Sequence, residues 1–96
     1  MNYDELKKLV VDKLVETGFT QRDDSFVHIE TRQSQVIVNG QASIQEHRLE
    51  IRLTILGEGA IDNDVTLGLN LSTNGEDGGD FWIRDLEDLA TFFRIR

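Results

Sequence analysis

The sequence predicts an α+β fold: an N-terminal helix, a three- to four-stranded antiparallel β-meander, and a C-terminal helix packed on one face of the sheet. Apolar residues recur at helical spacing near both ends and alternate with polar residues in between. Asn39-Gly40, a strong hairpin signal, divides the alternating region. Because the 96-residue chain contains no proline and no linker-like segment, residues 1–96 are expected to form one domain.

The first helix is predicted over residues 2–17. Asn2 and Glu5 have the spacing of a capping box, in which each side chain bonds the backbone of the other residue. Gly18 is the residue type that ends helices in the left-handed conformation, and Phe19 is expected to fold back onto the last turn. The stripe that faces the sheet is predicted to comprise Tyr3, Leu6, Leu9, Val10 and Leu14.

The strands are predicted from Phe26 onward. A change of phase at Gln33–Gln35 suggests a β-bulge or a short break. Residues 57–64 are expected to form a connection between two strands of the meander. The strands on either side are predicted to pair with their apolar residues on one face, namely Ile55 with Val65, Leu53 with Leu67, Ile51 with Leu69 and Leu49 with Leu71.

The C-terminal part is predicted to contain a loop, a short edge strand and a helix. Residues 74–80 are rich in glycine and acids and are expected to be a flexible loop, and 81–83 a short edge strand. Leu86, Leu89, Ala90 and Phe93 repeat at helical spacing, so a helix of about ten residues is predicted to start near Asp85. In that helix Phe93 is expected to face the core and Phe92 to face outward, where a second copy or a partner could contact it.

Negative charge is concentrated in one third of the chain. The formal net charge is −8, and nine of the eighteen acidic residues lie between Glu58 and Asp88, a stretch with Arg84 as its one basic residue. Such a charge argues against binding to nucleic acid or to anionic membrane, and it favours a basic partner. The alternative is that the acids serve solubility alone.

No motif for catalysis, a cofactor or a metal emerges from the sequence. The stretch from Asn74 to Asp85 approaches the spacing of a calcium loop, but Gly78 and Asp85 stand where such loops need an oxygen ligand and a bidentate glutamate. His28 and His47 lack the further ligands that zinc requires, so both are expected to be ordinary strand residues. We therefore predict a non-enzymatic protein with no cofactor and no metal site.

A cytoplasmic location is predicted. The chain has no cysteine, and its N-terminus lacks the basic and apolar regions of a secretory signal. It also lacks an apolar run of the ~20 residues needed to span a bilayer.

The candidate binding surface combines the clustered carboxylates with Trp82 as an aromatic anchor. Carboxylates held on a rigid surface can imitate backbone phosphates and occupy the basic groove of a nucleic-acid-binding protein. Phe81 is instead expected to close the edge of the core. The predicted partner-binding residues are Glu58, Asp62, Asp64, Glu76, Asp77, Asp80, Trp82, Asp85, Glu87 and Asp88.

In size, acidity and helix–meander–helix order, the chain resembles small phage-encoded counter-defence proteins, including some anti-CRISPR proteins. This resemblance implies an inhibitor of a basic, nucleic-acid-binding protein. The opening helix, the Gly18-Phe19 turn and the meander are also similar to the first part of type III secretion chaperones. The alternative function is therefore a chaperone or an immunity-type protein that binds a secreted effector or a toxin. The sequence leaves the partner's identity and the oligomeric state open.

Overall fold

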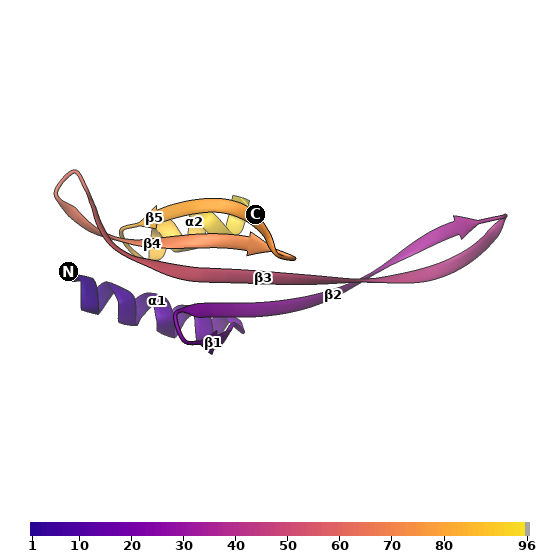
Figure 1. Ribbon diagram of the computed structural model, residues 1–96, viewed down its shortest axis with the longest axis horizontal. Coiled ribbons are helices and arrows are strands. Elements are labelled where there is room, and N and C mark those ends of the chain that lie inside the picture. The colour runs from indigo at the N-terminus through magenta and orange to yellow at the C-terminus, as the bar shows by residue number, and fades with distance from the viewer. Residues whose placement is uncertain (96) are drawn as a thin grey trace.

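A computed structural model of the chain describes the backbone of residues 1–95 and the side chains of residues 1–93. The strands form one antiparallel sheet in the order β1-β2-β3-β4-β5, with a helix before it and a helix after it (Figure 1). The predicted α+β class is confirmed, but the sheet has five strands, more than the three to four expected. In chain order the elements are α1 (Tyr3–Thr17), β1 (Thr20–Arg22), β2 (Ser25–Val38), β3 (Gln41–Ile61), β4 (Asp64–Thr73), β5 (Glu76–Ile83) and α2 (Leu86–Ile95).

Helix α1 begins and ends as the sequence predicts. The Asn2 Oδ1 atom accepts a hydrogen bond from the Glu5 N–H at 2.8 Å, which satisfies one of the free donors of the first turn. Gly18 ends the helix with φ of 110°, a conformation that costs glycine little. The predicted stripe is wrong at Leu9, which is 40% exposed, because the buried residues Leu6, Val10 and Leu14 follow a spacing of four.

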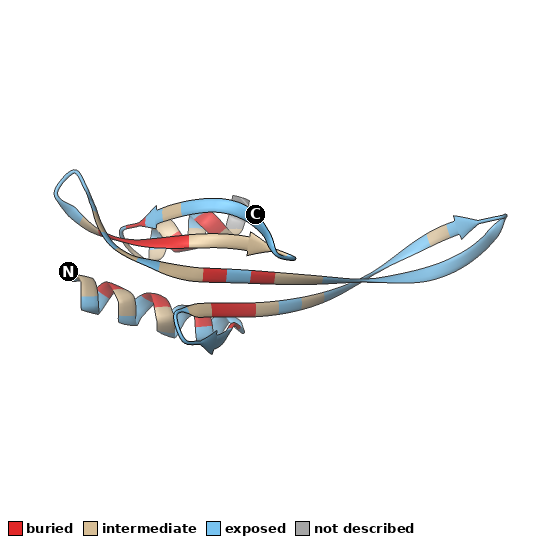
Figure 2. Ribbon diagram, in the orientation of Figure 1, coloured by how far each residue is buried: buried red, intermediate tan, exposed pale blue. Residues whose placement is uncertain are grey.

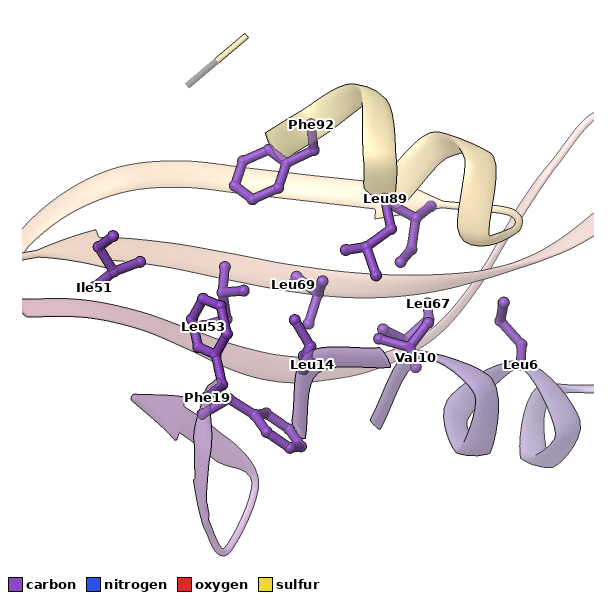
Figure 3. Close-up of a cluster of buried hydrophobic side chains, with 12 residues drawn as sticks. Leu6, Val10, Leu14, Phe19, Ile51, Leu53, Leu67, Leu69, Leu89 and Phe92 are labelled. Carbon is purple, nitrogen blue, oxygen red and sulfur yellow. The ribbon is translucent and has the colours of Figure 1, made fainter. Parts of the chain in front are cut away.

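The hydrophobic core lies between one face of the sheet and both helices. Alternate residues of the strands face it, among them Phe26, Leu53 and Leu69. Helix α1 contacts β4 and α2, and α2 contacts β5, so the helices lie next to each other on this face. Figure 3 shows Leu6, Val10 and Leu14 pointing from α1, and Leu89 and Phe92 from α2, toward the sheet.

Helix α2 differs from its predicted orientation. Phe92 is 7% exposed and packs on Phe81 of β5 with ring centroids 4.4 Å apart, so the prediction that it faces outward is wrong. Phe93 is half-buried, and its ring lies 6.0 Å from that of Phe19. Both rings fit on the buried face because they follow the buried Leu89 by three and four residues, which places all three on one side of a helix.

Three tight turns join the long strands, each with two residues at positive φ: Asn39-Gly40, Asp62-Asn63 and Asn74-Gly75. These dihedrals match the right-handed twist of a two-residue hairpin and favour Asn, Asp and Gly. The first turn confirms the prediction. The other two correct it, because residues 57–61 continue β3 where a connection was expected and residues 76–80 belong to β5 where a flexible loop was expected.

The strand registers also correct the sequence analysis. β2 and β3 pair without interruption from Ser25 to Val38, so the β-bulge predicted at Gln33–Gln35 is absent. Irregularities occur instead between Ile55 and Gly57 in β3 and opposite Leu71 in β4. The apolar phase changes near residue 36 because this part of the hairpin has left the core and buries neither face.

In the β3–β4 pair, Ile55 lies opposite Leu69 and not Val65, and Leu53 lies opposite Leu71. The predicted pairing was displaced because β3 continues to Ile61 before it turns. A displacement by an even number of residues keeps the same side chains on the same face, so apolar alternation cannot distinguish the two registers.

A long hairpin extends from the helix-covered part of the molecule, and we call its residues 31–48 the arm (Figure 1). β1 pairs with β2 only as far as Val27, and β4 pairs with β3 only from Ile51. All residues of the arm are exposed except Val36, which is intermediate (Figure 2). The arm gives the molecule its elongated shape of 60 × 23 × 21 Å.

Two leucines of α1 test the assignment of the core. Leu14→Ala should lower the free energy of unfolding by about 2–5 kcal/mol, because it leaves a cavity in packed surroundings. Leu9→Ala, the matched control on the exposed side, should cost less than about 1 kcal/mol. Urea unfolding followed by circular dichroism measures both values, and equal costs would contradict this orientation of α1.

Candidate functional site

The acidic residues singled out from the sequence form two groups in the structure. The first group, Glu76, Asp77 and Asp80, lies on strand β5. The second lies where the β3–β4 turn meets the start of α2, where one hollow is lined by Asp62 and Asp88 and another by Asp64 and Asp85. Of the remaining acids, Glu58 lies on β3 and Glu87 in the first turn of α2. The acids therefore line the two ends of β5 instead of forming one continuous array.

In the first group, Asn70 of β4 holds two carboxylates on the uncovered face of the sheet. Its Nδ2 donates hydrogen bonds to Asp77 Oδ1 at 2.9 Å and to Asp80 Oδ1 at 2.8 Å. Asp77 Oδ1 also accepts from the Gly79 N–H at 2.9 Å. The Gly79 N–H, and secondly the Asn70 amide, hold the pKa of Asp77 below its usual value, so this carboxylate stays charged to a lower pH than an ordinary aspartate.

In the second group, two carboxylates stabilise the start of α2. Asp85 Oδ1 accepts a hydrogen bond from the Asp88 N–H at 2.9 Å, which is the bonding expected of an N-cap. Asp88 Oδ2 accepts from the Arg84 N–H at 2.9 Å and forms an ion pair with Arg84 Nε at 3.4 Å. Asp85 and Asp88 thus have local structural roles, whereas Glu87 is exposed on the same turn.

Between the two groups an open groove of about 480 Å³ runs over the free edge of β5. Phe81 and Phe92 line it on the side of the helices, and Trp82 and Ile61 line it from the other side of the sheet. Its rim is charged. The lining residues are Ile61, Asp62, Phe81, Trp82, Ile83, Arg84, Asp88, Thr91 and Phe92.

A second, more polar hollow of about 430 Å³ adjoins the groove and brings Asp64 and Asp85 together beside Arg84 and Met1. Several residues of the site were not predicted from the sequence: Ile61, Ile83, Arg84 and Thr91 in the groove, and Asn70 behind the first acidic group. The alternation Leu69-Asn70-Leu71 does place Asn70 on the outer face, but no sequence pattern identifies its carboxylate partners.

Trp82 lies flat over two glycines of neighbouring strands. A Cβ atom on Gly68 or on Gly59 would lie 2.7 Å from Trp82 Cζ3, closer than packed atoms approach. The glycines therefore provide the space that lets the indole cover the sheet while Trp82 remains 45% exposed. An exposed but firmly supported tryptophan is a common anchor residue of protein interfaces.

The histidines lie apart from this site. His28 Nδ1 is 3.3 Å from the Gly18 carbonyl oxygen, and its ring lies 5.3 Å from that of Phe19. His47 Nε2 is 2.9 Å from Ser34 Oγ in the arm. Among the residues that the structure describes, no three His, Asp or Glu side chains are placed to hold a metal ion. None of the described helices is long and apolar enough to cross a bilayer.

Comparisons with known proteins give no relative: no protein family model, no curated protein and no solved structure matches this chain.

The hydrogen bonds of Asp77 on β5 predict that its pKa changes when Asn70 is substituted. Asn70→Ala should raise the pKa of Asp77, because the carboxylate loses one donor and keeps the Gly79 N–H. In the wild type the folded pKa lies below the ordinary value of 3.8, so the stabilisation from Asp77 is present above pH 3.8 and is lost as the pH falls through the folded pKa. NMR titration of the carboxyl carbons measures the shift, with Gln45→Ala in the arm as a control that should leave it unchanged.

The support of Trp82 by glycine is tested by a double-mutant cycle. Gly68→Ala should cost about 1–3 kcal/mol of unfolding free energy, because the indole has to move away from the new methyl group. The same substitution in a Trp82→Ala background should cost much less, since no ring is left to collide with. Trp82 is the single tryptophan, so its fluorescence should shift in Gly68→Ala as the ring moves. Equal costs in both backgrounds would contradict the contact.

Proposed function

We propose that this protein is a non-enzymatic inhibitor that binds a basic, nucleic-acid-binding protein through the free edge of β5. The observation that carries the proposal is the groove over this edge, which has a largely apolar lining, the exposed Trp82 and the carboxylates Asp62 and Asp88. Further carboxylates, Glu76, Asp77 and Asp80, precede it on the same strand. Such a surface suits a partner segment that offers an apolar side chain flanked by arginine or lysine.

The electrostatics favour a basic partner. Glu76 and Asp80 on β5, and Asp62 in the groove, are exposed and form no ion pair among the described side chains, whereas Asp88 is paired with Arg84. Asp77 is charged as well, and its lowered pKa means that it stays charged to a lower pH than an ordinary aspartate. Excess negative charge on a protein with a net charge of −8 attracts cationic surfaces at long range and speeds association with them.

Competition with nucleic acid follows from the same chemistry. The Asn70 amide donates hydrogen bonds to Asp77 and Asp80 and so holds the two carboxylates side by side. Because these side chains are already ordered, binding to a partner costs them little further conformational entropy. Arginines that bind phosphate also bind carboxylate through paired hydrogen bonds. A groove that normally holds a nucleic-acid backbone would therefore accept this edge of the sheet, and bound protein would exclude nucleic acid.

Two charge-reversal variants of equal size test the proposal. Glu76→Lys with Asp80→Lys changes the β5 surface, and Asp12→Lys with Glu16→Lys makes the same charge change on exposed positions of α1. The wild type and the α1 variant should capture the same basic protein from host lysate and release it with added salt or double-stranded DNA. The β5 variant should bind that protein about tenfold more weakly or worse.

A captured protein that binds both variants equally, or whose binding is insensitive to salt, would overturn the proposal. Trp82→Ala gives an independent reading, because removal of an aromatic anchor should weaken binding by about 2 kcal/mol without changing its salt dependence. Circular dichroism of each variant shows whether the fold has been retained.

A further inference from the structure

The arm has no neighbour in the fold and exposes both of its faces and both of its edges. Its two strands pair only with each other, since β1 stops at the partner of Val27 and β4 at the partner of Ile51. A two-stranded ribbon that packs on nothing is marginally stable in water, because its side chains bury too little surface to offset the lost chain entropy. We therefore expect another molecule to contact the arm and to bury part of its surface.

One face near the tip is apolar. Ile37 lies opposite Ala42, and Ile44 lies two residues further along β3, so strand alternation places these three side chains on the same face. Ile37 and Ile44 are each 73% exposed, which is unusual for isoleucine. The opposite face at the same level carries Val38, which is 56% exposed, beside Gln41.

The end of the arm around its tip contains no charged residue. Residues 33–45 contain no Asp, Glu, Lys, Arg or His, whereas the whole chain carries a net charge of −8. The charged residues of the arm, Arg32, Glu46 and Arg48, lie nearer its base and sum to +1, so the rest of the molecule carries −9. Two copies would repel each other wherever those acidic parts came together, and the tip of the arm is the place where they can meet without that cost.

We propose that two copies of this chain form a dimer in which their arms pack face to face through Ile37, Ala42 and Ile44. The same patch serves both partners, as a two-fold axis requires. Strand alternation places about half of residues 31–48 on this face, so the contact is smaller than a standard interface of roughly 20–30 residues per partner, and the dimer is expected to be a weak one. Because each arm projects from the helix-covered part, the dimer keeps the two acidic regions apart and leaves both β5 edges accessible.

Sedimentation velocity on the full chain tests the dimer directly. The wild type should sediment as a dimer at tens of micromolar, and Ile37→Lys with Ile44→Lys should raise the dimer dissociation constant about 100-fold or more, because four lysines would face one another. Val38→Lys introduces one lysine per chain on the opposite face and should leave dimerisation nearly unchanged. Each substituted position is exposed in the monomer, so circular dichroism should show a folded protein in every case.

A disulfide gives a second, positional test, because the chain contains no cysteine. Ala42→Cys places a thiol within the proposed contact, and Gln41→Cys places one on the opposite face. With oxidised glutathione as the oxidant, Ala42→Cys should form a covalent dimer on a non-reducing gel several times faster than Gln41→Cys. Any such disulfide joins two copies.

The dimer should also tolerate salt. Raising sodium chloride to about 0.5 M screens the repulsion between the acidic regions and leaves apolar packing intact, so the dissociation constant should stay constant or fall. Three results would each overturn the proposal: a monomeric wild type at a concentration of about 200 μM, Val38→Lys as disruptive as the double isoleucine variant, or equal cross-linking of the two cysteine variants.

Discussion

Strand β3 is the element on which the rest of the structure depends. Its residues, Gln41–Ile61, pair with β2 over the arm and the core and then with β4 up to the next turn. A single strand shared by two neighbours fixes the direction of both, since the backbone hydrogen bonds tie its residues to partners on each side, with one irregularity between Ile55 and Gly57. Only its middle part, around Ile51 and Leu53, is buried on the core face. The core thus holds the centre of β3 in place. Backbone hydrogen bonds with β2 order the strand toward the arm, and those with β4 order it toward the Asp62-Asn63 turn.

Only some of the acidic side chains are available to bind a partner. Asp85 and Asp88 cap the start of α2, and Asp88 also pairs with Arg84, so their charges are largely committed to the fold. Asp77 and Asp80 are also hydrogen-bonded, but to the neutral amide of Asn70, which orients them without cancelling their charge. The difference matters because an ion pair reduces the negative potential that a partner meets at the carboxylate. A neutral amide leaves that potential in place and orders the carboxylate before the partner binds. Proximity in sequence therefore says little about which carboxylates can act on a partner.

The proposed contacts lie in different parts of the molecule and rest on different physics. The β5 groove combines charge with an aromatic anchor and would be weakened by salt. The arm offers an uncharged, β-branched tip and would be insensitive to salt. Since the arm projects along the long axis of the molecule, occupation of one surface does not obstruct the other. A dimer would present two β5 edges at a fixed separation, which would raise the affinity for a partner with two basic sites.

The sequence by itself determined the helix α1, the α+β class and the Asn39-Gly40 hairpin, because each depends on local chemistry: a capping side chain, a repeat of apolar residues, a turn that needs positive φ. Asn74-Gly75 carried the same hairpin signal, but the glycines and acids that follow favoured a loop until pairing with β4 made them a strand. The β3–β4 register, the burial of Phe92 and the support of Trp82 by Gly59 and Gly68 were decided only by the tertiary structure. Alternation is unchanged by a shift of two or four residues, and two phenylalanines one position apart can both reach a core. The strand register and the burial of each side chain therefore depend on which residues pack beside them in the folded chain.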